Sequence, residues 1–135
     1  MIDLTGKKIL VTGATGFIGR AASVRLSQLG AAVIITGRNQ PKLDNTLSRL
    51  HGSGHHAAPF DIGNQGDVKG FLRSLVDTDG RKLDGFVYCA GIFPLRPLKS
   101  VSYDYLHEMM AINYFGFVEM VKCFSDRRVC RGGAL

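Results

Sequence analysis

Cysteine is scarce in this sequence, and its distribution argues against both a disulfide framework and a metal centre. The three cysteines, Cys89, Cys123 and Cys130, are odd in number and widely spaced, and no Cys-x-x-Cys pair occurs. None of the four histidines lies at a zinc-ligand spacing from a cysteine. We therefore expect free thiols in a reducing compartment, and no metal site.

Long apolar runs and targeting signals are also missing. No run approaches the roughly 20 residues that a helix needs to span a bilayer. The N-terminal residues, MIDLTGKK, lack the basic-then-apolar pattern of a secretory signal. These absences predict a cytoplasmic protein with no membrane partner.

The composition is that of an ordinary soluble globular protein, with 45% hydrophobic and 21% charged residues. With no internal repeat or low-complexity linker, the sequence predicts one domain over residues 1–135. A formal net charge of +6 could indicate a nucleic-acid partner. However, the basic residues are scattered, and the densest group (Arg127, Arg128 and Arg131) has no interleaved aromatic motif. We expect no nucleic-acid partner, because a phosphate-bearing cofactor explains the excess better.

The most informative stretch is KILVTGATGFIGR, residues 8–20. A short apolar run ends at Thr12, three glycines follow at a spacing of three (Gly13, Gly16 and Gly19), and a helical periodicity then begins. A glycine turn between a strand and a helix N-terminus makes an anion site. The first helical N–H groups lack partners, and glycine lets a pyrophosphate approach the main chain. The bare glycine pattern is weak evidence, so a turn that only packs a strand on a helix remains the alternative.

Downstream of this turn, strand-like runs alternate with helical stripes across short connections. The alternation predicts an α/β fold with a parallel sheet and right-handed crossovers. This is the first half of a Rossmann-type doubly wound sheet, in the order 3-2-1-4 with the start of strand 5. The expected strands are 9–12, 32–36, 55–60 and 83–90, and residues 132–135 resemble the beginning of the fifth.

The helices are predicted from apolar residues at helical spacing and from capping residues. Asn39, Asn64 and Ser102 are the expected N-caps of the second, third and fourth helices. The first helix carries the apolar stripe Ile18, Ala22, Leu26 and Leu29. The fourth, a long helix, carries the stripe Leu106, Met110, Phe117, Met120, Val121 and Phe124.

The residues after the second strand predict which nicotinamide cofactor fits. A carboxylate there would bind the adenine ribose 2′-OH, whereas an arginine would pair with a 2′-phosphate. This chain has Gly37 and Arg38, with no acid before Asp44, which favours NADP(H) over NAD(H). Arg20, early in the first helix, could assist. The alternative for Arg38 is an ordinary solvated arginine.

Two polar residues further along the chain are candidate site residues. Asp61 directly follows the third strand, at the carboxyl edge where ligands gather, and is expected to bond to the adenine amino group. A turn or capping role for Asp61 is the alternative. Asn113 falls on the apolar stripe of the fourth helix, where an amide is costly unless it is hydrogen-bonded. A satisfied core asparagine that holds a backbone group or a water is the alternative there.

Taken together, these motifs resemble the short-chain dehydrogenase/reductase family over essentially all 135 positions. TGATGFIG is similar to its glycine turn, TGR to its NADP-type second-strand end, and DI to its adenine-contacting aspartate. YCAG stands where the family usually has NNAG, and the IN of Ile112–Asn113 matches its helix asparagine. The resemblance implies that Asn113 has a catalytic role, holding a water in a proton relay. It implies cofactor contacts from Gly13, Thr15, Gly16, Phe17, Ile18, Gly19, Arg38, Asp61, Ile62, Cys89, Ala90 and Gly91.

The sequence departs from the family pattern at two of these motifs. The downstream motifs are most similar to 3-oxoacyl-carrier-protein reductases, which have glycine where Phe17 stands, whereas GFIG is typical of the extended branch. Tyr88 and Cys89 replace two asparagines, so the side-chain contacts of those asparagines are lost. Ala90 and Gly91 still allow a close approach of the backbone.

The family performs its reaction with a serine and a Tyr-x-x-x-Lys motif that follow the fourth helix. None of the four tyrosines here is followed by lysine four residues later. The resemblance implies an NADP(H)-dependent oxidoreductase that moves a hydride between nicotinamide and an alcohol/carbonyl substrate. We expect this chain to be the cofactor-binding half of such an enzyme, from a truncated gene or a fragment, and to be inactive alone. The alternative is a non-catalytic dinucleotide-binding module or subunit.

The predicted sheet has one further consequence for association. If the fourth strand is left as an unpaired apolar edge, that edge invites pairing with another chain. We therefore expect self-association in solution.

Overall fold

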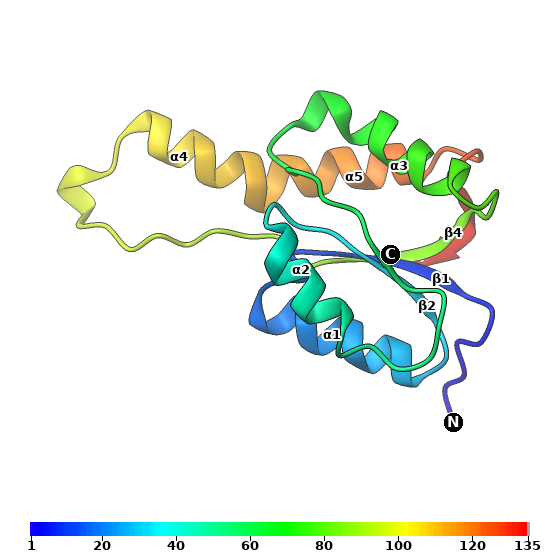
Figure 1. Ribbon diagram of the computed structural model, residues 1–135. Helices are drawn as coiled ribbons and strands as arrows, with labels where there is room; N and C mark the ends of the chain where they lie inside the picture. Colours follow the sequence, from blue (N-terminus) through cyan, green and yellow to red (C-terminus); the bar gives the residue numbers. More distant parts are fainter. Residues whose placement is uncertain (135) are drawn as a thin grey trace.

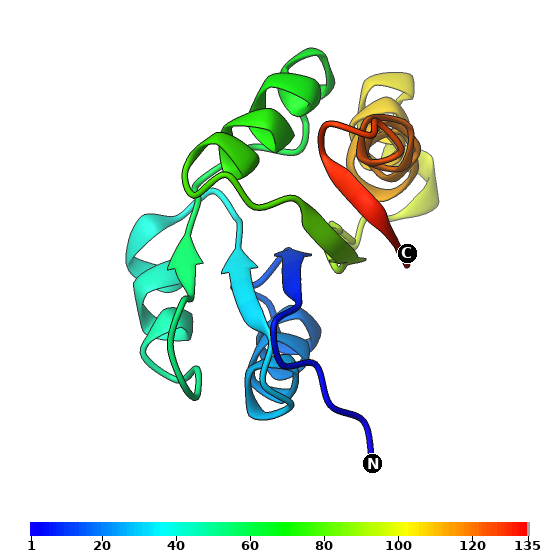
Figure 2. The same cartoon turned by 90° about the vertical axis from the view of Figure 1, so that its right-hand side faces the viewer.

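The computed structural model describes residues 1–134, which form a five-stranded sheet with helices on both faces. The neighbouring strands are parallel and their order is β3-β2-β1-β4-β5, which confirms the predicted Rossmann-like order (Figures 1 and 2). The strands are β1 (Lys8–Thr12), β2 (Ala32–Ile35), β3 (His56–Ala57), β4 (Leu83–Tyr88) and β5 (Cys130–Ala134). The helices are α1 (Phe17–Gln28), α2 (Gln40–Leu47), α3 (Val68–Asp77), α4 (Tyr103–Met110) and α5 (Gly116–Phe124). Shorter turns are η1 (Gln65–Asp67), η2 (Leu98–Ser100) and η3 (Ala111–Phe115). Leu135, in the expected fifth strand, lies outside the described residues.

The molecule has three layers, with α1 and α2 on one face of the sheet and α3 and α5 on the other (Figures 1 and 2). Successive residues of a strand point to opposite faces, so β1 contributes to both cores. Ile9 and Val11 pack on the α1 side, and Leu10 packs on the α3–α5 side. β1 is buried throughout, as expected for a central parallel strand.

The predicted apolar stripe of helix α1 is confirmed only in part: Leu26 packs against the core, and Ala22 and Leu29 are half-buried. Ile18, expected on the core side, is 71% exposed, whereas Gly19, Ser23 and Ser27 are buried. Small residues let the helix lie close to the sheet. Both serines remain satisfied, because their hydroxyls donate to helix carbonyls four and three residues back, at 2.7 Å each.

Strand β3 is shorter than the predicted 55–60. His55 lies outside it because its ring replaces a strand partner: Nδ1 accepts the N–H of Val33 at 3.0 Å, and Nε2 lies 2.8 Å from the carbonyl of His51. At the other end, bonding to the β2 side continues past Ala57: the N–H groups of Ala58 and Phe60 donate to the carbonyls of Ile35 at 2.9 Å and Gly37 at 3.0 Å. The stretch contains no β-branched residue, so its local strand propensity is weak and did not reveal where the regular strand begins or ends.

Two of the three predicted N-caps are confirmed. The side chains of Asn39 and Ser102 accept the N–H groups of Lys42 at 3.0 Å and Tyr105 at 3.2 Å. Asn64 makes no side-chain capping bond, and the 3₁₀ turn η1 stands between it and α3. The third helix therefore begins later than predicted.

The long fourth helix is a rod formed by α4, η3 and α5, with a π-helical turn at η3 (Figure 1). The predicted apolar stripe is wrong in its first half, where Leu106 and Met110 are 50% and 43% exposed and Asn113 is exposed as well. A π turn inserts an extra residue, so a regular helical spacing counted through it points to the wrong face. The buried residues of the rod are Tyr105, Ile112, Gly116, Met120, Cys123 and Phe124.

Strand β4 is not the unpaired edge that the sequence predicted. It pairs with β5, with Leu83 opposite Cys130 and an irregular register toward Gly85. The described end of the chain thus covers β4, and the open edge on this side of the sheet belongs to β5.

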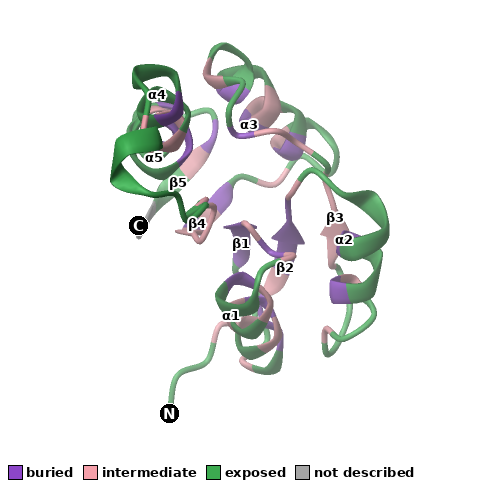
Figure 3. Ribbon diagram, turned by 90° about the vertical axis from the view of Figure 1, so that its left-hand side faces the viewer, coloured by how far each residue is buried: buried purple, intermediate pink, exposed green. Residues whose placement is uncertain are grey.

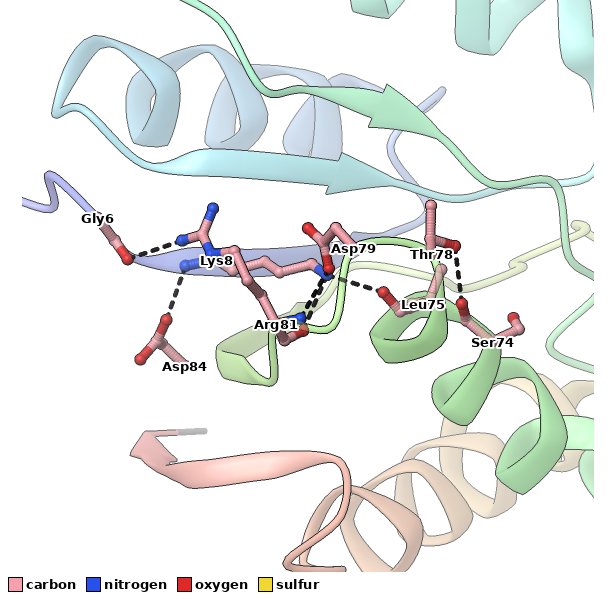
Figure 4. A network of polar contacts seen from close by, with 8 residues as sticks. All are labelled: Gly6, Lys8, Ser74, Leu75, Thr78, Asp79, Arg81 and Asp84. Carbon is pink, nitrogen blue, oxygen red and sulfur yellow. Dashed lines mark hydrogen bonds and ion pairs between the residues drawn. The ribbon is translucent and has the colours of Figure 1, made fainter.

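A buried lysine ties the amino edge of the sheet to the loop after α3 (Figure 4). The side chain of Lys8 is 2% exposed, and its Nζ lies 2.6 Å from an oxygen of Asp79. The same Nζ donates to the carbonyls of Leu75 at 2.8 Å and Arg81 at 3.0 Å. A buried ammonium is stable here because these three oxygens satisfy it.

Helix α4 and the connection before it project beyond the sheet, and most of their residues are exposed (Figures 1 and 3). Several of them are large and apolar: Phe93, Leu95, Leu98, Tyr103 and Leu106. Within residues 1–134, no helix combines the length and the hydropathy needed to cross a bilayer.

Candidate functional site

A cleft lies at the carboxyl edge of the sheet, where the segments after β1, β2, β3 and β4 meet. This is where open α/β sheets bind ligands, at the point where the strand order reverses. The cleft is lined by Thr12, Gly13, Thr15, Gly16, Thr36, Gly37, Arg38, Phe60, Asp61, Ile62, Cys89, Ala90, Gly91, Ile92 and Ile112.

Gly13 is required by both its conformation and its surroundings. Its φ of +62° lies in the left-handed region that favours glycine. A Cβ at this position would lie 2.5 Å from the carbonyl oxygen of Cys89 and 2.6 Å from the nitrogen of Ala90. Gly13 therefore lets the end of β1 lie directly against the end of β4.

The other two glycines of the turn have different tasks. A Cβ at Gly19 would lie 2.2 Å from the carbonyl oxygen of Gly13, so Gly19 packs the helix against the turn. Gly16 is exposed, lines the cleft and is the N-cap of α1, with no side-chain capping bond and no acidic residue in the first helical turn. The first N–H groups of α1 are therefore available to an anion at Gly16. The turn therefore packs β1 against α1, and it also places an uncapped helix N-terminus at the cleft.

Hydrogen bonds between strand ends hold the cleft together. The hydroxyl of Thr12 accepts the N–H groups of Cys89 at 3.1 Å and Ala90 at 3.3 Å, which ends the β4 ladder before residue 90. The N–H of Ala14 donates to the carbonyl of Thr36 at 3.2 Å, and so joins the glycine turn to β2. Preorganisation of this kind keeps the backbone groups of the turn in place before a ligand binds.

Arg38 lines the cleft from the loop after β2, and it is exposed. Among the described residues 1–134 its guanidinium makes neither a hydrogen bond nor an ion pair, which leaves its charge available to a ligand. Arg20, the suggested helper, is engaged elsewhere: its Nη2 donates to the carbonyl of Thr15 at 3.1 Å, and it does not line the cleft.

Asp61 faces the cleft and also shapes its own loop. Its Oδ1 accepts the N–H of Gly63 at 2.9 Å, which is the turn role that the sequence offered as an alternative. The residue lines the cleft together with Phe60 and Ile62, so the turn role and a ligand role are compatible.

The β4 side of the cleft presents backbone and small side chains. Cys89, Ala90 and Gly91 line it, as the resemblance implied for the segment that replaces NNAG. Burial raises the pKa of the Cys89 thiol, so this cysteine is a neutral, unreactive group at physiological pH.

Asn113 does not line the cleft but fixes its rim. Its Oδ1 accepts the N–H of Ile92 and its Nδ2 donates to the carbonyl of Ile92, both at 2.8 Å. The predicted alternative, an asparagine that satisfies a backbone group, is therefore present, although the residue is exposed rather than in the core. A Cβ at Gly91 would lie 3.3 Å from the Asn113 Oδ1, so this contact is close.

The structure brings most, but not all, of the predicted site residues together. Phe17, 91% exposed, and Ile18 stand on the outer side of the first turn of α1, and Gly19 lies behind the turn. None of these three lines the cleft. Sequence reasoning missed further lining residues, although most immediately adjoin predicted ones: Thr12, Thr36, Gly37, Phe60, Ile92 and Ile112. Extending each prediction to its strand neighbours would have found most of them.

The arrangement suits an elongated ligand with phosphates near its middle. The helix N-terminus at Gly16 would bind a pyrophosphate, with one half of the ligand toward Arg38 and Asp61 and the other toward Gly91. Among residues 1–134, no three histidine, cysteine or acidic side chains cluster closely enough to hold a metal ion. The strand order and the position of the cleft are those of a Rossmann-like α/β fold.

The chain belongs to the short-chain dehydrogenase/reductase family. The family described as short chain dehydrogenase matches residues 7–133, nearly the whole chain.

Individual relatives agree with this assignment. A glucose 1-dehydrogenase of Gluconobacter oxydans is 34% identical over 114 residues, covering 82% of this chain and 42% of the relative. An L-rhamnose 1-dehydrogenase (NAD(P)(+)) of Sphingomonas is 30% identical over 132 residues, covering 96% and 52%. The crystal structure of a dehydrogenase/reductase from Sinorhizobium meliloti superposes with a TM-score of 0.87 at 30% identity, covering 98% of this chain and 53% of that one. The chain spans about half the length of the curated relatives it matches.

Proposed function

We propose that this chain binds NADP(H) in the cleft, in preference to NAD(H), and is the cofactor-binding part of an oxidoreductase. The cofactor would supply or accept a hydride, and the substrate class would be an alcohol/carbonyl pair. The relatives support the general activity, because they are named as oxidoreductases and sugar dehydrogenases.

The observation that carries the cofactor preference is Arg38 at the open end of the cleft. Arg38 has no hydrogen-bond or ion-pair partner among residues 1–134, and no acid follows it before Asp44, so its guanidinium can pair with a 2′-phosphate. An acid at this place would repel that phosphate. The acid nearest along the chain, Asp44, instead accepts a hydrogen bond from Gln40 at 2.7 Å.

The remaining residues have separate tasks in this proposal. The N–H groups at the start of α1 would receive the pyrophosphate, and Asp61 would bond to the adenine amino group. Gly91 and Ile92 would border the nicotinamide half, at the place that Asn113 fixes.

Calorimetric titrations with adenosine 2′,5′-bisphosphate and with ADP test the role of Arg38. The wild-type chain should bind the 2′-phosphorylated ligand more tightly than ADP. Arg38→Leu should lower the affinity for the 2′-phosphorylated ligand by roughly tenfold, because one charge-assisted contact is lost. Binding of ADP should change little. A Lys42→Leu variant is the control, since that side chain is exposed but does not line the cleft. Equal losses for both ligands in Arg38→Leu would contradict the proposal.

We propose further that the 135-residue chain alone does not reduce carbonyl compounds. None of its tyrosines is followed by lysine four residues later. Among residues 1–134, no histidine or tyrosine lines the cleft to exchange a proton with a substrate. An assay of NADPH oxidation with a panel of sugars and ketones should show no turnover above background. Turnover by the mass-verified chain would contradict this part of the proposal.

A further inference from the structure

Tyr88, the last residue of β4, bonds into the middle of the helical rod. Its hydroxyl donates to the carbonyl of Ile112 at 2.5 Å. Its ring packs edge-on against Phe117, with centroids 5.5 Å apart and an interplanar angle of 68°. Burial raises the pKa of Tyr88 to about 12, so the phenol keeps its proton at neutral pH and stays a donor.

The bond from Tyr88 lies within the π turn, where the carbonyl of Ile112 lacks its usual helical N–H donor. In a regular α-helix the N–H of Gly116 would donate to the carbonyl of Ile112, four residues back. Here it donates to Ala111, five residues back. Side chains from outside the rod bond to both carbonyls: Gln65 Nε2 donates to Ala111 at 2.9 Å, and Tyr88 donates to Ile112. The π turn is therefore held from the side of the sheet.

Gly116 makes room for the phenol. A Cβ at position 116 would lie 2.6 Å from the Tyr88 hydroxyl oxygen and 3.1 Å from the carbonyl oxygen of Ala111. Real Cβ atoms do not come so close, so the tyrosine at 88 and the glycine at 116 are matched. Together they fix how near the rod lies to the end of β4.

The π turn sets the position of Asn113, which follows Ile112 directly. Both amide atoms of Asn113 bond to the backbone of Ile92 at 2.8 Å. Ile92 and Ile112 line the cleft at its β4 end, away from Arg38 on the β2 side. A shift of the turn would therefore move the β4 rim of the cleft and leave its adenosine side in place.

We propose that Tyr88 is a positioning residue for the nicotinamide half of the dinucleotide. It acts through the π turn and Asn113 on Ile92, and it does not touch the ligand. This inference rests on the proposed function, in which a dinucleotide spans both ends of the cleft. It also gives a task to a residue that stands where the family usually has asparagine.

The first test compares two ligands on a conservative variant. Tyr88→Phe removes one oxygen and keeps the ring against Phe117. It should weaken binding of NADP⁺ by about three- to tenfold, the loss of one hydrogen bond, and leave adenosine 2′,5′-bisphosphate unchanged. Tyr114→Phe is the matched control: it makes the same change in the same turn, and the Tyr114 hydroxyl has no hydrogen-bond partner within residues 1–134. It should leave both affinities unchanged.

The second test needs no ligand. In NMR spectra of the free protein, Tyr88→Phe should shift the side-chain amide resonances of Asn113 and speed hydrogen exchange of the Ile92 N–H. Tyr114→Phe should do neither. Gly116→Ala, whose Cβ would displace the phenol, is the second variant if Tyr88→Phe fails to fold, and it should give the same pattern.

The outcomes separate the two proposals. Unchanged Asn113 resonances and unchanged NADP⁺ affinity in a folded variant would overturn the role of Tyr88. An equal loss of affinity for both ligands would also overturn the role of Tyr88, because the effect would then not be confined to the β4 end of the cleft. If the wild-type chain binds neither ligand, the proposed function fails, while the Asn113 spectra still decide whether Tyr88 sets the turn.

Discussion

At the scale of single residues, the glycines of the first turn differ in what they do. Gly13 and Gly19 are packing positions, since a Cβ at either would lie within 2.6 Å of backbone atoms. At Gly16 the nearest contact of a Cβ would be 3.3 Å, from the carbonyl oxygen of Gly13. The spacing of the glycines was visible in the sequence, but this division was not, because it depends on how closely β4 and α1 approach the turn.

Two alanine substitutions should separate stability from binding. Gly13→Ala combines a positive φ with a severe overlap, and should lower the free energy of unfolding by ~2 kcal/mol or more. Gly16→Ala should cost far less stability and act mainly on nucleotide affinity. Urea denaturation with parallel NADP⁺ titration measures both. Similar stability losses in the two variants would contradict the assignment.

Lys8 is the other residue whose role needed the structure. Its position at the start of a strand gave no sign that its ammonium is buried on three oxygens (Figure 4). Lys8→Met should lower the free energy of unfolding by roughly 2–4 kcal/mol, because two carbonyls lose their donor. Asp79→Asn should cost less, since Asp79 is 38% exposed and water can replace its partner. Thermal melts of both variants test which substitution costs more stability. A larger loss for Asp79→Asn than for Lys8→Met would show that the carboxylate is the main anchor.

At the scale of elements, the predictable parts were those with a strong, uninterrupted pattern. The strands β1, β2 and β4 and the sheet order followed from apolar runs and short connections. The bounds of β3 and the buried face of the rod did not follow from the sequence, because they depend on local geometry. The ring of His55 takes the place of a strand partner, and the π turn at η3 shifts the helical phase. The hydrophobic periodicity of the sequence reveals neither effect.

Strand β3 makes stability sensitive to mild acid. Burial, and secondly the charge of Lys8, lower the pKa of His56 below its ordinary 6.5. The unfolded chain therefore binds a proton near pH 6.5 while the folded chain does not, so stability falls as the pH drops from 6.5 toward the folded-state pKa. Urea midpoints at pH 7.5 and 5.5 should differ more for the wild type than for His56→Gln. An equal difference in both proteins would show that other groups cause the loss.

At the scale of the whole molecule, two uncovered apolar areas bear most on association. One is the outer side of the rod, where Leu106 and Val118 are 50% and 46% exposed. The other is a hollow of about 510 Å³ between α1 and the β4–β5 side of the sheet, lined in part by Leu26 and Val87. β5 adds an open strand edge. Open strand edges and large exposed apolar side chains favour association between chains.

We therefore still expect self-association, although β4 itself is paired. Sedimentation velocity at micromolar concentration should show species heavier than the 14.7 kDa monomer. Leu106→Lys with Val118→Lys should shift the distribution toward monomer, because charges replace apolar contacts. A single monomeric species in the wild type, with a cooperative melt, would contradict the expectation.

We propose above all that the cleft binds a phosphorylated dinucleotide through the α1 N-terminus and Arg38. Fluorescence titration of the wild-type chain with NADPH and with NADH, under the same salt conditions, tests it most directly. We expect saturable binding of both nucleotides, with NADPH the tighter by roughly tenfold, about 1.4 kcal/mol. Tighter binding of NADH, or no binding of either, would contradict it.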